Sequence, residues 1–259
     1  MSVASPTASH TAMPPRVDFV LVRPARAANV AAACRALANM GWRRLRLVAP
    51  LPDLADPAAR ALAYGAWDLL DGAEVCASLA EAVADAEWVV GTSGKSQPGA
   101  LEPRAFARRL AGGARRRVAL VFGPEASGLT RSELNLCHTL VHIPAAPEHP
   151  SLNLAQAVLI LAYETFLALA APHAEPAPAA RAEAPPASAG ELEDVLRQLR
   201  EALLEAGFLD PHNPEAILAE LRRLLARAAP TPRELLLLRG LVRQVGWAGR
   251  IARGRRTHR

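Results

Sequence analysis

Apolar runs alternate with helix-spaced apolar positions along the first two thirds of the chain. The runs, which have the length and β-branched content of buried strands, are Val17–Val22, Arg43–Ala49, Trp88–Val90, Val118–Phe122 and a stretch around Leu140–Ile143. Helices are predicted from the spacing of apolar residues at Ala27–Met40, Pro57–Ala63, Leu79–Ala86, Pro103–Leu110 and a short piece after Gly128. The segment Trp67–Cys76 is predicted to be a turn plus a short strand. This alternation predicts an α/β fold with a mostly parallel sheet covered by helices on both faces.

The pattern changes after residue 170. Ser151–Leu169 is predicted to be a helix that is apolar nearly all round, which is typical of a core or subunit interface. Residues 171–190 are rich in Ala and Pro and are interpreted as a linker. Helical spacing returns at Glu191–Ala206, Pro214–Ala228 and Pro232–Val245. We therefore expect one α/β domain at residues 16–170 and a small all-α, basic C-terminal domain at 191–259.

Bulk composition narrows the class of protein. The 259 residues are long enough for one large and one smaller domain. No apolar run in the sequence reaches the roughly 18 residues expected of a membrane span, so no membrane partner is expected. Residues 1–15 have neither a basic start nor an apolar core and are interpreted as a disordered leader. Three scattered cysteines fit neither a disulfide framework nor a zinc site and favour the cytoplasm.

The positive charge is concentrated at the C-terminal end. No acidic residue follows Glu234, whereas seven arginines do: Arg239, Arg243, Arg250, Arg253, Arg255, Arg256 and Arg259. A polyanion such as nucleic acid is the natural partner of such an end, because each contacted phosphate releases counterions. The alternative is a solvated tail that only keeps the protein soluble.

Three loops rich in Gly, Ser or Pro follow predicted strands, at residues 91–99, 123–128 and 144–150. The carboxyl ends of parallel strands meet at one edge of a sheet, which is where α/β proteins bind ligands. The dinucleotide-binding and Walker patterns are both missing from the sequence. It also offers no Ser/His/Asp set, no paired carboxylates at helical spacing and no metal-ligand cluster, so hydrolytic and metal chemistry lack support.

Several residues of these segments have both a functional and a structural interpretation. Lys95 is the only lysine among thirty basic residues, and its compact ammonium group suits a phosphate or carboxylate, although it could be an ordinary loop residue. Glu125 could face a cleft or accept hydrogen bonds within its own turn. Ser151 and Asn153 could cap a helix or hold a ligand at its N-terminus. Arg35 could be a surface charge.

Three motifs occur in a fixed order across residues 16–170. They are Asn29-Val-Ala-Ala-Ala-Cys-Arg35, Leu120-Val-Phe-Gly-Pro-Glu-Ala-Ser-Gly-Leu129, and Ile143-Pro followed by Ser151-Leu-Asn-Leu-Ala155 and Tyr163-Glu164. Together they resemble the SpoU/TrmH branch of the knotted SPOUT methyltransferases. Gly91-Thr-Ser93, Ala146-Pro-Glu148 and the helical tail are similar to the TrmJ-type enzymes, which methylate the ribose 2′-hydroxyl of cytidine or uridine at tRNA nucleotide 32.

The resemblance implies a C-terminal trefoil knot, a homodimer, a tRNA substrate, and S-adenosylmethionine as cofactor with no metal. It places the cofactor against Thr92, Ser93, Gly94, Gly123, Ile143, Ser151, Leu152 and Asn153. It implies catalytic roles for Arg35, Asn29, Glu125, Ser151 and Asn153, and we expect RNA contacts from Arg23, Lys95, Arg250, Arg253, Arg255 and Arg256. The chain departs from the family pattern at Ala31, Gln97 and His149. An rRNA ribose methyltransferase and a non-catalytic RNA-binding protein are the alternatives.

Overall fold

The computed structural model describes residues 15–51, 54–113, 117–170 and 185–256. Its centre is a six-stranded sheet in the order β3-β2-β1-β5-β4-β6, in which every pairing is parallel. The strands are β1 Arg16–Val22, β2 Leu45–Val48, β3 Glu74–Cys76, β4 Trp88–Ser93, β5 Arg117–Phe122 and β6 Thr139–His142. The parallel sheet predicted from the apolar runs is therefore confirmed.

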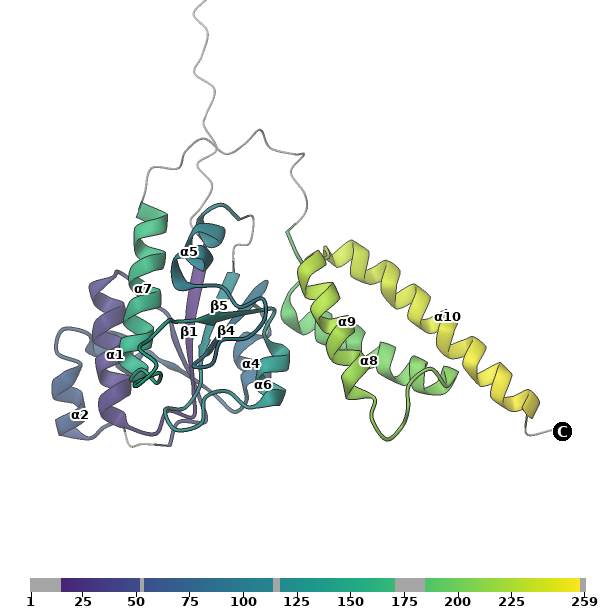
Figure 1. The fold of residues 1–259 in the computed structure, drawn as a ribbon, viewed down its shortest axis with the longest axis horizontal. Helices are drawn as coiled ribbons and strands as arrows, with labels where there is room; N and C mark the ends of the chain where they lie inside the picture. Colours follow the sequence, from purple (N-terminus) through teal and green to yellow (C-terminus); the bar gives the residue numbers. More distant parts are fainter. Residues whose placement is uncertain (1–14, 52–53, 114–116, 171–184, 257–259) are drawn as a thin grey trace, which may run out of the picture.

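Helices cover both faces of the sheet (Figure 1). Phe19 and Leu21 of β1 belong to one buried cluster and Val20 and Val22 to another, because successive side chains of a strand point to opposite faces. The first cluster also holds α1 Ala27–Asn39, α3 Trp67–Asp71, α5 Pro103–Ala111 and α7 Leu154–Ala170, and α2 Pro57–Leu62 packs beside α1. The second holds α4 Leu79–Val83 and side chains of α6 Arg131–Leu136.

Two predicted elements of this part differ from the structure. The segment Trp67–Asp71 is a helix rather than a turn, and it buries Leu69 and Leu70 against the first cluster. Helix α7 begins at Leu154 rather than Ser151. Its N-cap is Asn153, whose side-chain oxygen accepts a hydrogen bond from the backbone N–H of Ala155 at 2.9 Å.

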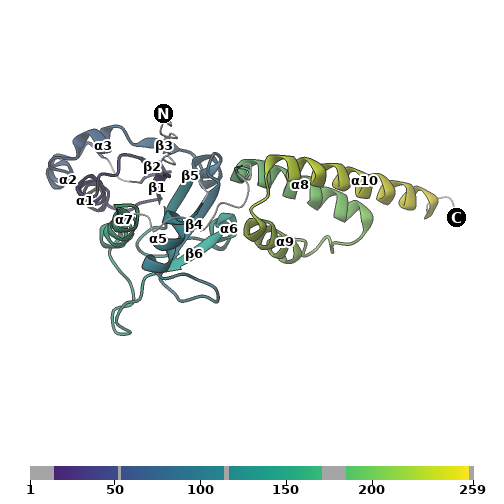
Figure 2. The same cartoon turned by 90° about the horizontal axis from the view of Figure 1, so that it is seen from above.

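Three further helices follow, α8 Ala189–Ala206, α9 Glu215–Ala228 and α10 Pro232–Arg256, and they extend away from the sheet (Figures 1 and 2). Helix α8 begins within the predicted linker because Ser188 and Glu191 form a capping box. Backbone N–H groups of Ala189 and Gly190 also donate to the carbonyls of Ala86 (2.7 Å) and Ala84 (3.0 Å), which attaches α8 to the connection between α4 and β4. The predicted leader and the linker residues 171–184 lie outside the described residues, apart from Pro15.

Helix α10 continues to Arg256, well past the predicted end at Val245. Gly246 and Gly249 lie inside the helix and allow α10 to approach α8 closely. A Cβ at Gly249 would lie 2.8 Å from the backbone nitrogen of Ala206. Within the described ranges, no helix is long and apolar enough to cross a membrane.

Candidate functional site: a cavity at the carboxyl edge of the sheet

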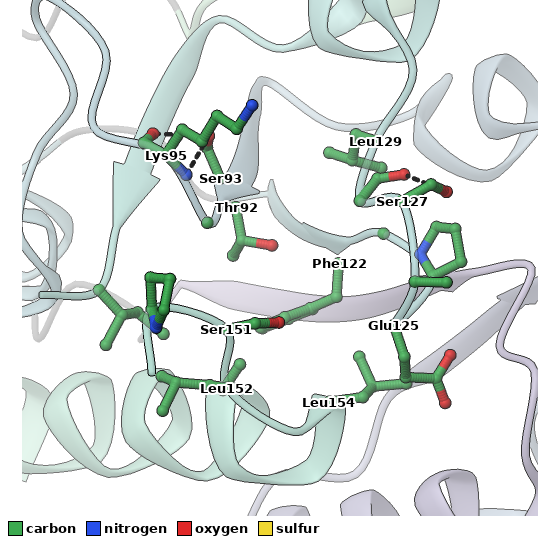
Figure 3. Close-up of a pocket in the computed structure, with 18 of the residues that line it drawn as sticks. Thr92, Ser93, Lys95, Phe122, Glu125, Ser127, Leu129, Ser151, Leu152 and Leu154 are labelled. Atoms are coloured by element: carbon green, nitrogen blue, oxygen red, sulfur yellow. Dashed lines mark hydrogen bonds between the residues drawn. The ribbon is translucent and has the colours of Figure 1, made fainter. Parts of the chain in front are cut away.

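A cavity of ≈ 460 Å³ lies where β4, β5 and β6 end. Figure 3 shows Lys95 and Ser93 on one side, Ser127 and Leu129 on the opposite side, and Phe122 between them. Its lining mixes apolar side chains with hydroxyl groups and backbone. The predicted cofactor residues that line it are Thr92, Ser93, Gly94, Gly123, Ile143, Ser151 and Leu152. The three predicted loops therefore meet at one cavity, although Asn153, the eighth predicted cofactor residue, is not among the residues that line it.

The wall that follows β5 is packed backbone against backbone. A Cβ at Gly123 would lie 2.3 Å from the amide nitrogen of Leu129, a distance that no side chain tolerates. Gly128 has a φ of +67°, in the left-handed region that favours glycine, and its N–H donates to the Pro124 carbonyl at 2.8 Å. These two glycines fold the segment into a compact loop that forms one side of the cavity.

The loop after β4 is fixed by side-chain hydroxyls. The Thr92 hydroxyl donates to the carbonyl of Val121 on β5 at 3.1 Å, and the Ser93 hydroxyl donates to the Lys95 carbonyl at 2.8 Å. Gln97 also lines the cavity, and its side-chain amide donates to the Ser93 hydroxyl at 3.3 Å. These contacts fix the backbone of Lys95 at the rim of the cavity, and its side chain is exposed.

Glu125, Asn29 and Asn153, which are distant in sequence, form one hydrogen-bonded network. The Asn29 side-chain amide donates to Glu125 Oε1 at 2.6 Å, and the Asn153 amide donates to Asn29 Oδ1 at 2.9 Å. Glu125 Oε2 also accepts from the backbone N–H of Ala25 at 3.1 Å. Partial burial acts to raise the pKa of Glu125, but these hydrogen bonds and the nearby Arg26 charge outweigh it and lower the pKa. The network therefore carries an ionised carboxylate and joins α1, the β5 loop and the start of α7.

Arg35 lies apart from this network. It follows Asn29 by six residues on α1, which corresponds to about 9 Å along the helix axis. Its side chain is exposed, and none of the described residues forms a hydrogen bond or ion pair with it. The chain by itself therefore does not bring Arg35 to the cavity, and a catalytic role requires the substrate or a second copy to complete the site.

The family pattern of the SpoU rRNA Methylase family matches residues 16–163, which is more than half of the chain and includes every loop of the cavity. The chain belongs to the SpoU rRNA methylase family. A second pattern, that of the C-terminal domain of the tRNA methyltransferase TrmJ, matches residues 190–257.

Several known proteins are similar to this chain over most of its length and theirs. A tRNA (cytidine/uridine-2′-O-)-methyltransferase TrmJ from Klebsiella pneumoniae is 40% identical over 88% of this chain and 96% of its own length. The protein of that name from Yersinia enterocolitica is 41% identical over 88% of this chain and 91% of its own length. The crystal structure of TrmJ from Z. mobilis ZM4 superposes with a TM-score of 0.76 at 33% identity, covering 90% of this chain and 99% of that one.

The arginines that we predicted to contact RNA have different environments in this SpoU chain. Arg23 makes a two-point ion pair with Glu133, through Nη1 with Oε1 and through Nη2 with Oε2 at 3.0 Å. Arg250 pairs with Glu205 at 2.7 Å. Arg253, Arg255 and Arg256 belong to the end of α10, and their side chains lie outside the described part. RNA contact by these residues stays a prediction.

Glu133 is a structural residue that sequence reasoning missed. The hydrogen bond from Arg23 lowers the pKa of Glu133 to about 2 despite partial burial, with help from the N–H of Thr130. The spacing Thr130-x-x-Glu133 is a capping-box pattern, and it could have fixed the start of the predicted short helix, α6, and identified this carboxylate. Of the residues that depart from the family pattern, His149 is exposed and Ala31 is buried within α1. No group of three metal-binding side chains occurs among the described residues.

Proposed function

We propose that the protein transfers a methyl group to a ribose 2′-hydroxyl of tRNA. The proposal rests on the cavity at the carboxyl edge of the sheet, which lies within the part of the chain that matches the SpoU family. The chain also matches TrmJ enzymes over most of its length and theirs. These relatives are named for methylation of cytidine and uridine in tRNA. A solved structure at 29% identity, with a TM-score of 0.50, concerns 2′-OH methylation of C/U34 on tRNA. We infer nucleotide 32 of the anticodon loop as the target, with 34 as the competing position.

S-adenosylmethionine is the proposed cofactor, and the cavity fits it. A volume of ≈ 460 Å³ is typical of small-molecule sites, and Ile143, Leu152 and Leu154 offer an apolar surface for an adenine ring. Thr92–Gly94, Gly123, Ile143 and Ser151–Asn153 would hold the cofactor, which supplies an electrophilic methyl group when bound. The tight turn at Gly123 brings the loop backbone, rather than a side chain, to the cavity surface. We propose that the loops of residues 123–130 and 143–153 belong to a trefoil knot.

The polar residues of the site position the ribose. The ionised Glu125 fixes Asn29, and Asn29 in turn fixes Asn153 at the start of α7, beside Ser151. Arg35 would bind the phosphate of the target nucleotide and orient the 2′-hydroxyl, because a guanidinium stays charged at all relevant pH values and acts electrostatically. Lys95 would contact the RNA from the rim.

The architecture of the active protein is proposed to be a homodimer in the cytoplasm. Helix α7 exposes Leu159 (40%), Tyr163 (46%), Phe166 (41%) and Leu167 (42%). These positions share one side of the helix, opposite the buried Val158, Leu161 and Thr165. An apolar helix side of this kind favours a subunit interface. We divide the chain into a methyltransferase domain at residues 16–170, a linker, and a tRNA-binding helical domain that begins at Ala189.

Primer-extension mapping of ribose methylation tests the activity. Purified protein is incubated with S-adenosylmethionine and either tRNA or rRNA transcripts, and tRNA from a deletion strain is mapped in parallel. A primer-extension stop at tRNA nucleotide 32 that depends on the protein supports the proposal. Methylation of rRNA alone would indicate an rRNA ribose methyltransferase instead. Calorimetry with S-adenosylmethionine identifies a non-catalytic RNA-binding protein by the absence of binding. Arg35→Ala should abolish turnover while cofactor affinity stays unchanged, and near-normal turnover would refute the role of Arg35.

A further inference from the structure

Apart from Arg109, the described basic residues of the α/β part fall into two groups, ion-paired and unpaired. Most of those in the described ranges form ion pairs with carboxylates, namely Arg16, Arg23, Arg44, Arg46, Arg60, Arg104 and Arg117. Arg109 lies over the ring of Trp88. The exposed basic side chains without a hydrogen bond or ion pair from a described residue are Arg26, Arg35, Arg43, Lys95, Arg108 and Arg131. These cations keep all their donors available for a ligand.

Arg26 and Arg131 belong to this second group and lie beside the cavity. Arg26 directly precedes α1, and the preceding residue, Ala25, donates its N–H to Glu125 at 3.1 Å. Arg26 is close enough for its charge to act on the Glu125 carboxylate. Arg131 is the first residue of α6 and comes two residues after Leu129, which lines the cavity.

Neither arginine is part of the cavity lining, but by their places in the chain they flank the Gly123–Gly128 loop, Arg26 next to the residue that binds Glu125 and Arg131 just beyond Leu129. Lys95 stands on the opposite rim of the same cavity. A ribose that enters such a cavity carries one phosphate on its 5′ side and one on its 3′ side. An unpaired guanidinium binds a phosphate through two parallel N–H donors, whereas the ion-paired arginines would have to break an existing contact first.

We propose that Arg26 and Arg131 are RNA-binding residues that hold the phosphates adjacent to the target nucleotide. This inference rests on the proposed function and adds two residues that the family motifs do not contain. Arg26 and Arg131 come from segments fixed by hydrogen bonds to Glu125 and by the α6 capping box, so their backbones are rigid. Rigid placement restricts where the RNA backbone can lie and thereby which nucleotide reaches the cavity.

The chain offers two matched controls. Arg43 is equally unpaired among the described residues, but it comes just before β2, at the opposite edge of the parallel sheet. Arg108 is exposed on α5, away from the cavity lining. If net charge alone attracted tRNA, then removing any of the four arginines would have a similar effect.

The test compares Arg26→Ala, Arg131→Ala and the double variant with Arg43→Ala and Arg108→Ala. Fluorescence anisotropy gives the tRNA Kd at several salt concentrations, calorimetry gives the S-adenosylmethionine Kd, and thermal melting checks the fold. We expect each rim variant to weaken tRNA binding about fivefold to twentyfold, and to reduce the slope of log K against log salt by about 0.7. Cofactor affinity should be unchanged, and the controls should stay within about twofold of wild type.

The outcomes separate this inference from the proposed function. If wild type methylates tRNA but the rim variants behave like Arg43→Ala, then the inference is wrong and the function stands. If wild type neither binds nor methylates tRNA, then the proposed function fails and the inference fails with it. Arg26→Lys and Arg131→Lys should restore the salt slope but only part of the affinity, since lysine binds a phosphate as a point charge. Equal loss in the Lys and Ala variants would contradict phosphate binding.

Discussion

At the scale of single residues, Glu125 is the centre of the site's polar structure. It accepts hydrogen bonds from Asn29 and from the backbone of Ala25, so its two oxygens each have a donor. In Glu125→Gln, an NH2 group would replace one of the carboxylate oxygens, and this new donor would face either the Asn29 amide or the Ala25 N–H, which are donors themselves. We expect kcat to fall about tenfold to a hundredfold through misplacement of Asn29 and Asn153, whereas the S-adenosylmethionine Kd changes less than about threefold. Steady-state kinetics and calorimetry measure both, and unchanged kcat would refute the role of the network.

The matched control for this variant is Glu148→Gln. Glu148 is an exposed carboxylate in the neighbouring loop and does not line the cavity. Its replacement removes the same charge without touching the network. A similar fall in kcat in both variants would point to net charge instead.

The Glu133 carboxylate contributes to the stability of the fold in a pH-dependent way. Its pKa is lowered to about 2 in the folded protein, so its carboxylate stabilises the fold fully above the unfolded pKa near 4.5, and the contribution is lost as pH falls toward 2. Glu133→Gln should therefore reduce the free energy of unfolding by about 2–3 kcal/mol at pH 7, and this difference should shrink at pH 3. Urea denaturation at both pH values measures it. Glu102→Gln, at an exposed carboxylate, should show almost no change, and a pH-independent difference at Glu133 would contradict the ion pair.

At the scale of elements, the sequence predicted those strands and helices that depend only on the local pattern of apolar residues. The strands were found because buried parallel strands are apolar runs such as Val118–Phe122, and α1 was found with its end at Gly41, which has a φ of +74°. The five-residue α3 was missed because it is too short for helical periodicity to be recognised. The end of α10 was missed because Gly249 is required by the α8 backbone, which lies far away in sequence.

The candidate site was predictable only as a set of loops. The motifs contain many of the residues that line the cavity, but the ion pair between Arg23 and Glu133 spans 110 residues and depends on the fold. The distance of Arg35 from the cavity likewise depends on where α1 lies. Unpaired cations such as Arg26 and Arg131 become recognisable only when the partners of the other arginines are known.

The loop after β5 gives a prediction at this scale. Gly123→Ala would place a methyl group within 2.3 Å of the Leu129 amide, so the turn must open. We expect a loss of about 1–3 kcal/mol in the free energy of unfolding and at least tenfold weaker S-adenosylmethionine binding. Gly94→Ala is the control for stability, since a Cβ there meets nothing within 4 Å. Calorimetry and denaturation measure the two effects, and wild-type stability of Gly123→Ala would show that the loop is not tightly packed.

At the scale of the whole molecule, two apolar surfaces compete as sites of self-association. One is the exposed side of α7, which contains Tyr163 and Phe166, and the other is on α10, where Leu236 and Leu237 are 65% and 67% exposed. The α7 side belongs to the helix whose Leu154 and Ala157 line the cavity, so an interface there adjoins the site. We therefore assign the proposed homodimer to α7.

Charged substitutions separate the two surfaces. Tyr163→Glu and Phe166→Glu each place a carboxylate in the proposed interface, where burying it without a partner is costly. Both side chains are more than 40% exposed in the single chain, so the monomer should still fold. We expect dimer dissociation constants at least about a hundredfold higher, measured by sedimentation or light scattering, while Leu236→Glu remains dimeric. If Leu236→Glu gave monomers and the α7 variants did not, then the interface would lie on α10 and the cavity would face solvent in both subunits.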